Sequence, residues 1–96
     1  MTTTDNIVKG LNEAKGRFNG TLGIKTLALF GSFARGDQTE KSDIDVLVDM
    51  SKPSFDGYMD LKFFLEDRFK TKVDLVLDDT LKPRLRERIV KEMIRA

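Results

Sequence analysis

Three aspartates stand inside apolar segments of this sequence, where charged side chains need a reason to be. Asp43 and Asp45 flank Ile44 at the start of one segment, and Asp74 is the second residue of another. Alternate residues of a β-strand point to the same face, so Asp43 and Asp45 are expected to present two carboxylates side by side. Adjacent carboxylates repel, and a divalent cation between them relieves the repulsion. The spacing favours a cation site, although acids at a strand end that simply face water would show the same spacing.

Asp74 favours the cation interpretation because it is out of step with its own segment. The apolar residues Val73, Leu75 and Leu77 share one face of the expected strand, and Asp74 falls on the other face with Val76. A third carboxylate on a second strand is therefore available to the same site.

A Gly31-Ser32 pair follows a further apolar segment and precedes a possible helical turn. Backbone N–H groups at such a junction can hold phosphate oxygens, glycine allows close approach, and Ser32 adds a hydroxyl. Arg35, three residues later, carries a guanidinium fork suited to phosphate. A Gly-Ser pair alone is more often an ordinary turn. Combined with three carboxylates, it predicts a site for a metal ion and a nucleotide.

The composition removes most other chemistries. The 96 residues include no cysteine and no histidine, which excludes disulfides, zinc–thiolate and iron–sulfur sites, and His-based catalysis. A metal must then bind oxygen ligands, as Mg²⁺, Mn²⁺ and Ca²⁺ do. The 17 basic and 16 acidic residues nearly cancel, so the net charge of +1 gives no argument for non-specific binding to nucleic acid or membranes.

The segments that must position these residues predict a single α/β (α+β) domain over residues 1–96. Short apolar runs predict strands at 24–30, 43–49 and 73–77, which would form a small three-stranded sheet. A short helical turn is expected at 33–36. No apolar run approaches the roughly 18 residues of a membrane span, the first residues lack the pattern of a signal peptide, and a cytoplasmic location is expected.

Helices are expected before, between and after these strands. Thr4 is the expected N-cap of the first, which closes at Gly20 and Gly23, and Asp56 is the expected N-cap of the second. The last begins at about Lys82 and carries apolar residues at four-residue intervals: Leu81, Leu85, Ile89 and Met93.

Taken together, the motifs resemble those of the minimal nucleotidyltransferases of the DNA polymerase β superfamily. That family has Gly-Ser, about ten residues, and then Asp-x-Asp, followed by a third carboxylate on a later strand. Here ten residues separate Ser32 from Asp43, and Asp74 matches the third carboxylate. The resemblance extends over residues 27–77. It implies a polymerase-β-like fold with a small mixed sheet packed by helices.

The resemblance also implies a reaction. Members of this fold bind ATP with two Mg²⁺ ions, a substrate hydroxyl attacks the α-phosphorus, and pyrophosphate leaves. By match, Asp43 and Asp45 would bridge both metals and Asp74 would hold the metal at the nucleophile. The nucleotide-binding residues would be Gly31 and Ser32, at the β- and γ-phosphates, and Arg35, at the triphosphate.

Small members of this family are commonly antitoxin partners of HEPN-domain RNases and resemble enzymes that move AMP from ATP onto a tyrosine of the toxin. This implies a hetero-oligomer with a HEPN toxin and a nucleoside triphosphate substrate. No membrane partner is expected, and the near-neutral charge argues against nucleic acid as a partner. Two alternatives remain: an antitoxin that neutralises its partner by binding alone, and transfer to RNA or a small molecule.

Three further features have both a functional and an ordinary explanation. The basic last helix would contact an acidic partner surface or RNA, or is simply a solvated face. The aromatic cluster would stack bases or pack the core, and Phe63 falls off its apolar stripe. Asp49 is expected to be a surface or capping residue. The basic residues of this segment are Lys82, Arg84, Arg86, Arg88, Lys91 and Arg95. The aromatic cluster consists of Phe55, Tyr58, Phe63, Phe64 and Phe69.

Overall fold

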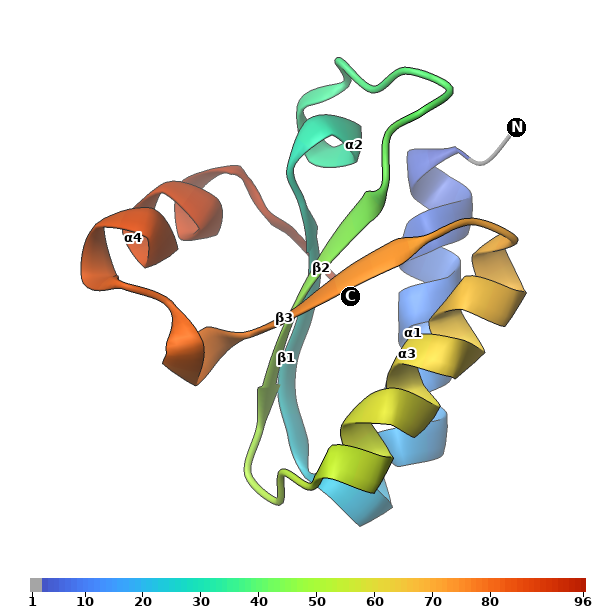
Figure 1. Cartoon of the computed structure of the whole chain (residues 1–96), viewed down its shortest axis with the longest axis vertical. Helices are drawn as coiled ribbons and strands as arrows, with labels where there is room; N and C mark the ends of the chain where they lie inside the picture. Colours follow the sequence, from blue (N-terminus) through green and yellow to red (C-terminus); the bar gives the residue numbers. More distant parts are fainter. Residues whose placement is uncertain (1–2) are drawn as a thin grey trace.

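The computed structural model describes residues 3–96, which form helices on both sides of a four-stranded mixed sheet (Figure 1). In chain order the elements are α1 (Thr4–Leu22), β1 (Ile24–Phe30), α2 (Ser32–Arg35), β2 (Ile44–Met50), α3 (Phe55–Phe69), β3 (Val73–Leu77), the 3₁₀ turn η1 (Asp78–Thr80), α4 (Pro83–Glu92) and β4 (Ile94–Arg95).

The sheet has the strand order β3-β2-β1-β4. β1 pairs antiparallel with both β2 and β4, whereas β2 pairs parallel with β3. A parallel pair needs a crossover connection, and α3 supplies it. Figure 1 shows α1 and α3 together on one side of the sheet and α4 on the other. The two faces therefore differ: one is covered by two long helices, and the other is only partly covered by α4. We call them the covered face and the open face.

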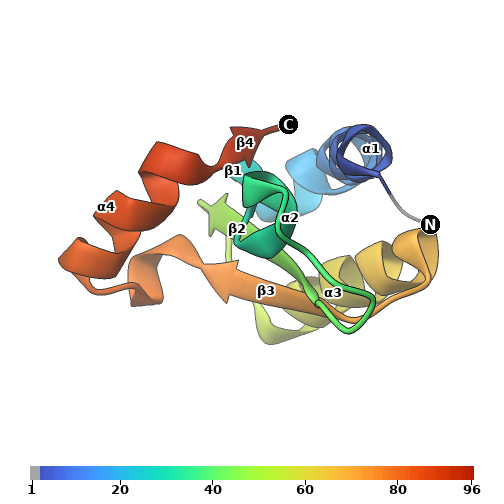
Figure 2. The same ribbon diagram turned by 90° about the horizontal axis from the view of Figure 1, so that it is seen from above.

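The expectation of three strands was wrong, because the chain adds a fourth after α4. The helix ends at Glu92. The backbone of Met93 is extended (φ −68°, ψ 151°), and Ile94 and Arg95 then pair with Leu29 and Ala28 (Figure 2). Met93 was expected to continue the helical stripe and instead lies just beyond it. A strand of two residues has no periodicity, so no pattern in the sequence predicts it.

The covered face holds the hydrophobic core. The edge-to-face rings of Phe18 and Phe64, 5.6 Å apart, show that aromatic side chains pack between α1 and α3, which favours the packing explanation of the cluster. Phe63 is 57% exposed, consistent with its place off the stripe. Fully or almost fully buried residues of this core include Ile7, Leu11, Leu27, Leu29, Val46, Val48, Leu61, Leu65 and Val73.

The strand predictions at 24–30 and 73–77 are confirmed, and β2 begins one residue later than expected. Both predicted N-caps were wrong by one or two positions. Thr3 caps α1 by accepting from the Asn6 N–H at 3.2 Å, and Ser54 caps α3 by accepting from the Gly57 N–H at 3.0 Å. Thr4 and Asp56 are also residue types that cap helices. The extended backbone that an N-cap needs, however, is found at Thr3 and Ser54.

β3 is an edge strand, and side chains bond several of its backbone groups. The Val73 N–H donates to Glu66 Oε2 at 3.1 Å, and the Leu75 carbonyl accepts from the Tyr58 hydroxyl at 2.6 Å. The Leu77 carbonyl accepts from Thr80 Oγ1 at 2.7 Å. These bonds occupy three of the backbone groups that an added strand would pair with. Within residues 3–96, no helix combines the length and the apolar character that crossing a membrane would require.

Candidate active site

The sheet places Asp45 directly beside Asp74. They are register partners on the parallel strands β2 and β3, which lie about 4.8 Å apart as neighbouring strands do. The residues on either side of Asp45 point to the covered face, so both carboxylates project from the open face. Asp43 stands just before β2 and two residues from Asp45. The structure therefore brings together the three aspartates that the sequence singled out.

Asp45 is the electrostatic centre of this group. Partial burial, followed by the negative charges of Asp74 and Asp43, raises the pKa of Asp45 to about 6. Arg35 acts in the opposite direction, and Glu92 adds a further negative charge. A carboxylate whose pKa is raised by neighbouring negative charges is strongly stabilised by a bound cation, because the cation offsets the repulsion that raised the pKa.

The donor set suits a hard divalent cation such as Mg²⁺, which prefers carboxylate oxygens. As the side chains stand in residues 3–96, however, no three carboxylates come close enough together to enclose a metal ion. The strands place the three carboxylates on a common face. Their side chains would have to rotate toward one another to surround an ion.

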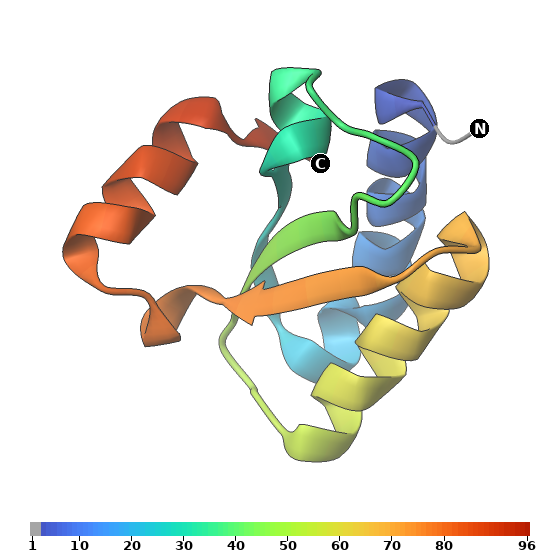
Figure 3. The same ribbon diagram turned by 45° about the horizontal axis from the view of Figure 1, so that its top comes forward.

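The Gly31-Ser32 turn lies against Asp45. Gly31 has φ +74° and ψ −151°, a region that essentially only glycine occupies, and a Cβ atom here would overlap the Asp45 carboxylate. Two separate constraints therefore require glycine. Phe33, which follows the turn, is buried beneath it. Figure 3 shows α2 and the following loop at the end of the sheet where β1 ends and β2 begins.

Ser32 and Arg35 lie at the same end of the sheet. The Ser32 hydroxyl has no hydrogen-bond partner among the described residues, so it is free to bind a ligand. The Arg35 side chain contacts two acids: Nε lies 3.2 Å from Asp37 Oδ2, and Nη1 lies 3.2 Å from Glu92 Oε1. Hydrogen bonds with Asp37 and then Glu92 raise the pKa of Arg35. Arg35 is thus a cation at the site, and its guanidinium is already paired with the carboxylates of Asp37 and Glu92.

A cleft of about 310 Å³ separates the open face of the sheet from α4. Asp74 and Val76 line it from β3, and Arg88 and Glu92 line it from α4. Neither of these α4 residues is among the site residues that the motifs predict. A signal was present, because residues 85, 88, 89 and 92 fall on one helical face, so that Arg88 and Glu92 share the apolar stripe. All four basic residues of α4 are exposed, Arg88 included, which supports the solvated-face explanation for Arg84, Arg86 and Lys91.

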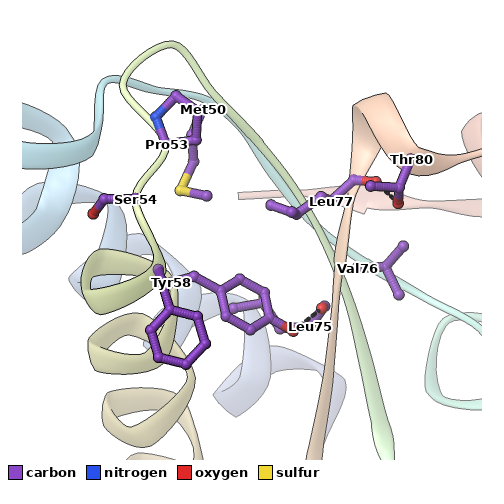
Figure 4. Close-up of a pocket in the computed structure, with 9 residues that line it drawn as sticks. Met50, Pro53, Ser54, Tyr58, Leu75, Val76, Leu77 and Thr80 are labelled. Atoms are coloured by element: carbon purple, nitrogen blue, oxygen red, sulfur yellow. Dashed lines mark hydrogen bonds between the residues drawn. The ribbon is translucent and has the colours of Figure 1, made fainter.

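A larger cavity of about 670 Å³ lies at the other end of β3 (Figure 4). Its walls are mainly apolar and include Met50, Tyr58 and Leu77, and no acidic or basic side chain lines it. Size alone would make it the first candidate for a site. The residues with chemistry lie elsewhere. Of the predicted site residues, Arg35 and Asp74 line the smaller cleft, so we place the candidate active site where that cleft meets Asp45 and the Gly31-Ser32 turn.

The mixed sheet, the three aspartates and the adjoining Gly-Ser turn together define a nucleotidyltransferase domain. Residues 12–95 match the family described as Polymerase beta, Nucleotidyltransferase, and the chain belongs to that family. The resemblance found in the motifs is thereby confirmed, as is the mixed α+β fold that it implied.

Three relatives match this chain over nearly the whole length of both chains. The protein adenylyltransferase MntA of Thermococcus cleftensis is 32% identical over 95 residues, which cover 98% of this chain and 96% of MntA. A protein of Methanocaldococcus jannaschii assigned the same activity is 37% identical over 98 residues, with 98% of each chain covered. A solved structure assigned as a minimal nucleotidyltransferase superposes with a TM-score of 0.83 at 29% identity, covering 97% and 95% of the two chains.

Proposed function

We propose that this protein transfers AMP from ATP, with Mg²⁺, to a hydroxyl group of a partner protein. The observation that carries the proposal is the register of β2 and β3, which sets Asp45 beside Asp74 at the Gly31-Ser32 turn. In this arrangement, carboxylates that can bind divalent cations lie next to a glycine turn whose backbone a phosphate can approach closely. Nucleotidyl transfer needs both, because the reacting phosphate is an anion and must be neutralised and aligned.

Each residue has a distinct role in this proposal. Gly31 and Ser32 bind the β- and γ-phosphates through their N–H groups and the free hydroxyl, and Arg35 pairs with the triphosphate. Asp43 and Asp45, with Asp74 as a further ligand, would hold two Mg²⁺ ions, which would supply the positive charge that neutralises the phosphate oxygens. Asp74 orients the acceptor side and receives the proton of the attacking hydroxyl. The new bond joins that oxygen to the α-phosphorus, and the bond to pyrophosphate breaks.

We place the acceptor on a tyrosine of a HEPN-domain RNase toxin encoded beside this chain, which would make the protein an antitoxin of the cytoplasm. Support comes from the relative named protein adenylyltransferase MntA. The same fold occurs in a toxin–antitoxin structure with AMP-PNP, at 24% identity and a TM-score of 0.70. It also occurs in an MNT antitoxin in complex with a tri-AMPylated HEPN toxin of Shewanella oneidensis, at 21% identity and a TM-score of 0.60. The candidate cleft is small, so the partner is expected to supply the acceptor.

Intact-mass spectrometry of the candidate partner tests this proposal. The partner is incubated with the protein, ATP and Mg²⁺, and a parallel reaction uses the Asp43→Asn/Asp45→Asn variant. Asp49→Asn is the matched control, because Asp49 lies on the same strand as Asp45 but at its other end. We expect the mass of one or more AMP groups to be added by the wild type and by Asp49→Asn, and not by the double variant.

The same experiment separates the alternatives. A partner that is bound and silenced without any gain in mass would contradict transfer and favour neutralisation by binding alone. A partner that is neither modified nor bound would contradict the antitoxin role, and RNA and small molecules would then be tested as acceptors.

A further inference from the structure

Glu92, the last residue of α4, contacts both groups that the proposed function assigns to the triphosphate. Its Oε1 accepts a hydrogen bond from the Gly31 N–H at 3.3 Å, and both of its carboxylate oxygens lie 3.2–3.3 Å from Arg35 Nη1. A carboxylate thus lies where a phosphate anion would bind. We propose that the Glu92 carboxylate competes with the triphosphate for the Gly31 N–H and the Arg35 guanidinium. A ligand then binds at this position only by displacing Glu92. This inference rests on the proposed function.

The position of Glu92 is not that of an ordinary surface ion pair. Its side chain is only 29% exposed and lies in the cleft together with Asp74. A fourth acid near Asp43, Asp45 and Asp74 adds repulsion to a region that already carries three negative charges. Arg35 and the Gly31 N–H offset that repulsion, and both are ligands suited to an anion.

The backbone under Glu92 is fixed, so the side chain is the part that can move. Two residues later, Ile94 pairs with Leu29 in the sheet, and the Ala96 N–H donates to the Leu27 carbonyl at 2.9 Å. The helix therefore stays anchored at this end. Rotation about the side-chain bonds of Glu92 would clear Gly31 and Arg35 without moving any element.

Arg88 provides a place for the displaced carboxylate. It lies one helical turn before Glu92, lines the same cleft, and forms no ion pair among the described residues. Residues four apart on a helix are neighbours, so the two side chains can pair once the triphosphate has taken Arg35. The exchange keeps the Glu92 carboxylate beside a guanidinium both before and after ligand binding.

The inference makes a prediction about selectivity. Competition at the β- and γ-phosphate position weakens the binding only of ligands that reach that position. Removing the carboxylate should therefore tighten binding of ATP and of inorganic tripolyphosphate, and should leave the binding of AMP unchanged. Loss of Glu92 thus acts on the part of the nucleotide that leaves as pyrophosphate.

Isothermal titration calorimetry of the full chain with ATP, tripolyphosphate and AMP in the presence of Mg²⁺ tests the inference. We expect Glu92→Gln to lower the Kd for ATP and tripolyphosphate about tenfold, as expected when a charge-assisted contact no longer competes. Glu87→Gln is the matched control, because it removes the same charge from an exposed position of α4. Glu92→Ala is a second variant that also removes the remaining amide, and circular dichroism confirms folding.

The outcomes are distinct. Unchanged or weaker ATP binding by Glu92→Gln and Glu92→Ala would overturn the inference and leave the proposed function standing. An equal gain with Glu87→Gln would also overturn it, because the effect would then come from the overall charge of α4. If the wild type and all variants fail to bind ATP and tripolyphosphate, the nucleotide site itself is refuted, and the proposed function fails together with this inference.

Discussion

The two faces of the sheet are built for different purposes. On the covered face, side chains from α1, α3 and alternate strand positions are almost completely buried and uniformly apolar. On the open face, the same strands present Asp45 and Asp74, and α4 contributes one buried residue, Ile89. A 96-residue chain has little surface to bury, so it concentrates stability on one face. The other face can then carry repelling charges that the fold itself does not need.

The strongest way to break this comparison is to damage the covered face. Leu61 is fully buried on α3, and Leu61→Ala should lower the free energy of unfolding by about 3 kcal/mol through lost burial and the cavity left behind. Denaturant unfolding measures the loss. Phe63→Ala, two residues later and largely exposed, should change stability by less than about 0.5 kcal/mol. Equal effects of the two variants would show that the covered face is not the source of stability.

A second test lies where the open face meets the Gly-Ser turn. Gly31→Ala forces a Cβ atom into the Asp45 carboxylate at a backbone conformation that alanine avoids, and should cost about 2 kcal/mol and most of the transfer activity. Gly36→Ala is the matched control, because Gly36 also has positive φ (+83°) but its Cβ would meet open space. We expect Gly36→Ala to lose about 1 kcal/mol and retain activity. Thermal unfolding and the AMP-transfer assay together would contradict this account if the two variants behaved alike.

The edge of the sheet allows a smaller test. Tyr58→Phe removes the hydroxyl that bonds the Leu75 carbonyl at 2.6 Å, and should reduce the free energy of unfolding by about 1 kcal/mol. Urea unfolding measures the change. No measurable change would show that this bond does not stabilise β3.

The pH dependence of stability is the finest test of the open face. The pKa of Asp45 is raised to about 6 in the folded protein, so the contribution of its protonated form is present below about pH 4 and is lost as the pH rises through 6. Asp45→Asn cannot ionise, and in metal-free buffer it should exceed the wild type in Tm above pH 6 and match it below pH 4. Because Asp45 is only half-buried, we expect a difference of at most about 1 kcal/mol.

Magnesium should reverse this difference in the wild type, because the cation binds the ionised carboxylate. We expect Mg²⁺ to raise the Tm of the wild type above pH 6 and to have little effect on Asp45→Asn. A wild-type Tm that is insensitive to both pH and Mg²⁺ would mean that Asp45 does not experience the repulsion described here.

Local patterns in the sequence were enough for most elements. β1 and β3 are short apolar runs bounded by turn residues, and their bounds are confirmed. The motif also predicts the three aspartates and Gly31 as site residues, and the structure places Asp45 beside Asp74 and against Gly31. Parts that depend on distant pairing could not be predicted. β4 is held only by its pairing with β1, and the contact between Glu92 and Gly31 joins residues 61 apart in the chain.

The register of β2 and β3 is the most informative feature that the sequence could not supply. Periodicity placed Asp45 and Asp74 on strands, but the alignment of parallel strands depends on how α3 packs between them. A shift of one residue would have turned Asp74 toward the core. The structure sets it beside Asp45, and the proposed chemistry depends on that placement.

The most direct test of the central claim is therefore the AMP transferred to the partner by Asp74→Asn, measured as intact mass beside Asp79→Asn. Asp79 lies on η1, outside the cleft, and serves as the matched acidic control. Our account predicts that Asp74→Asn folds as stably as the wild type but adds AMP at least about 100-fold more slowly, the size of effect expected for losing a group that acts in the transition state. Asp79→Asn should transfer normally. Transfer by Asp74→Asn at the wild-type rate would contradict the assignment of the open face as the active site.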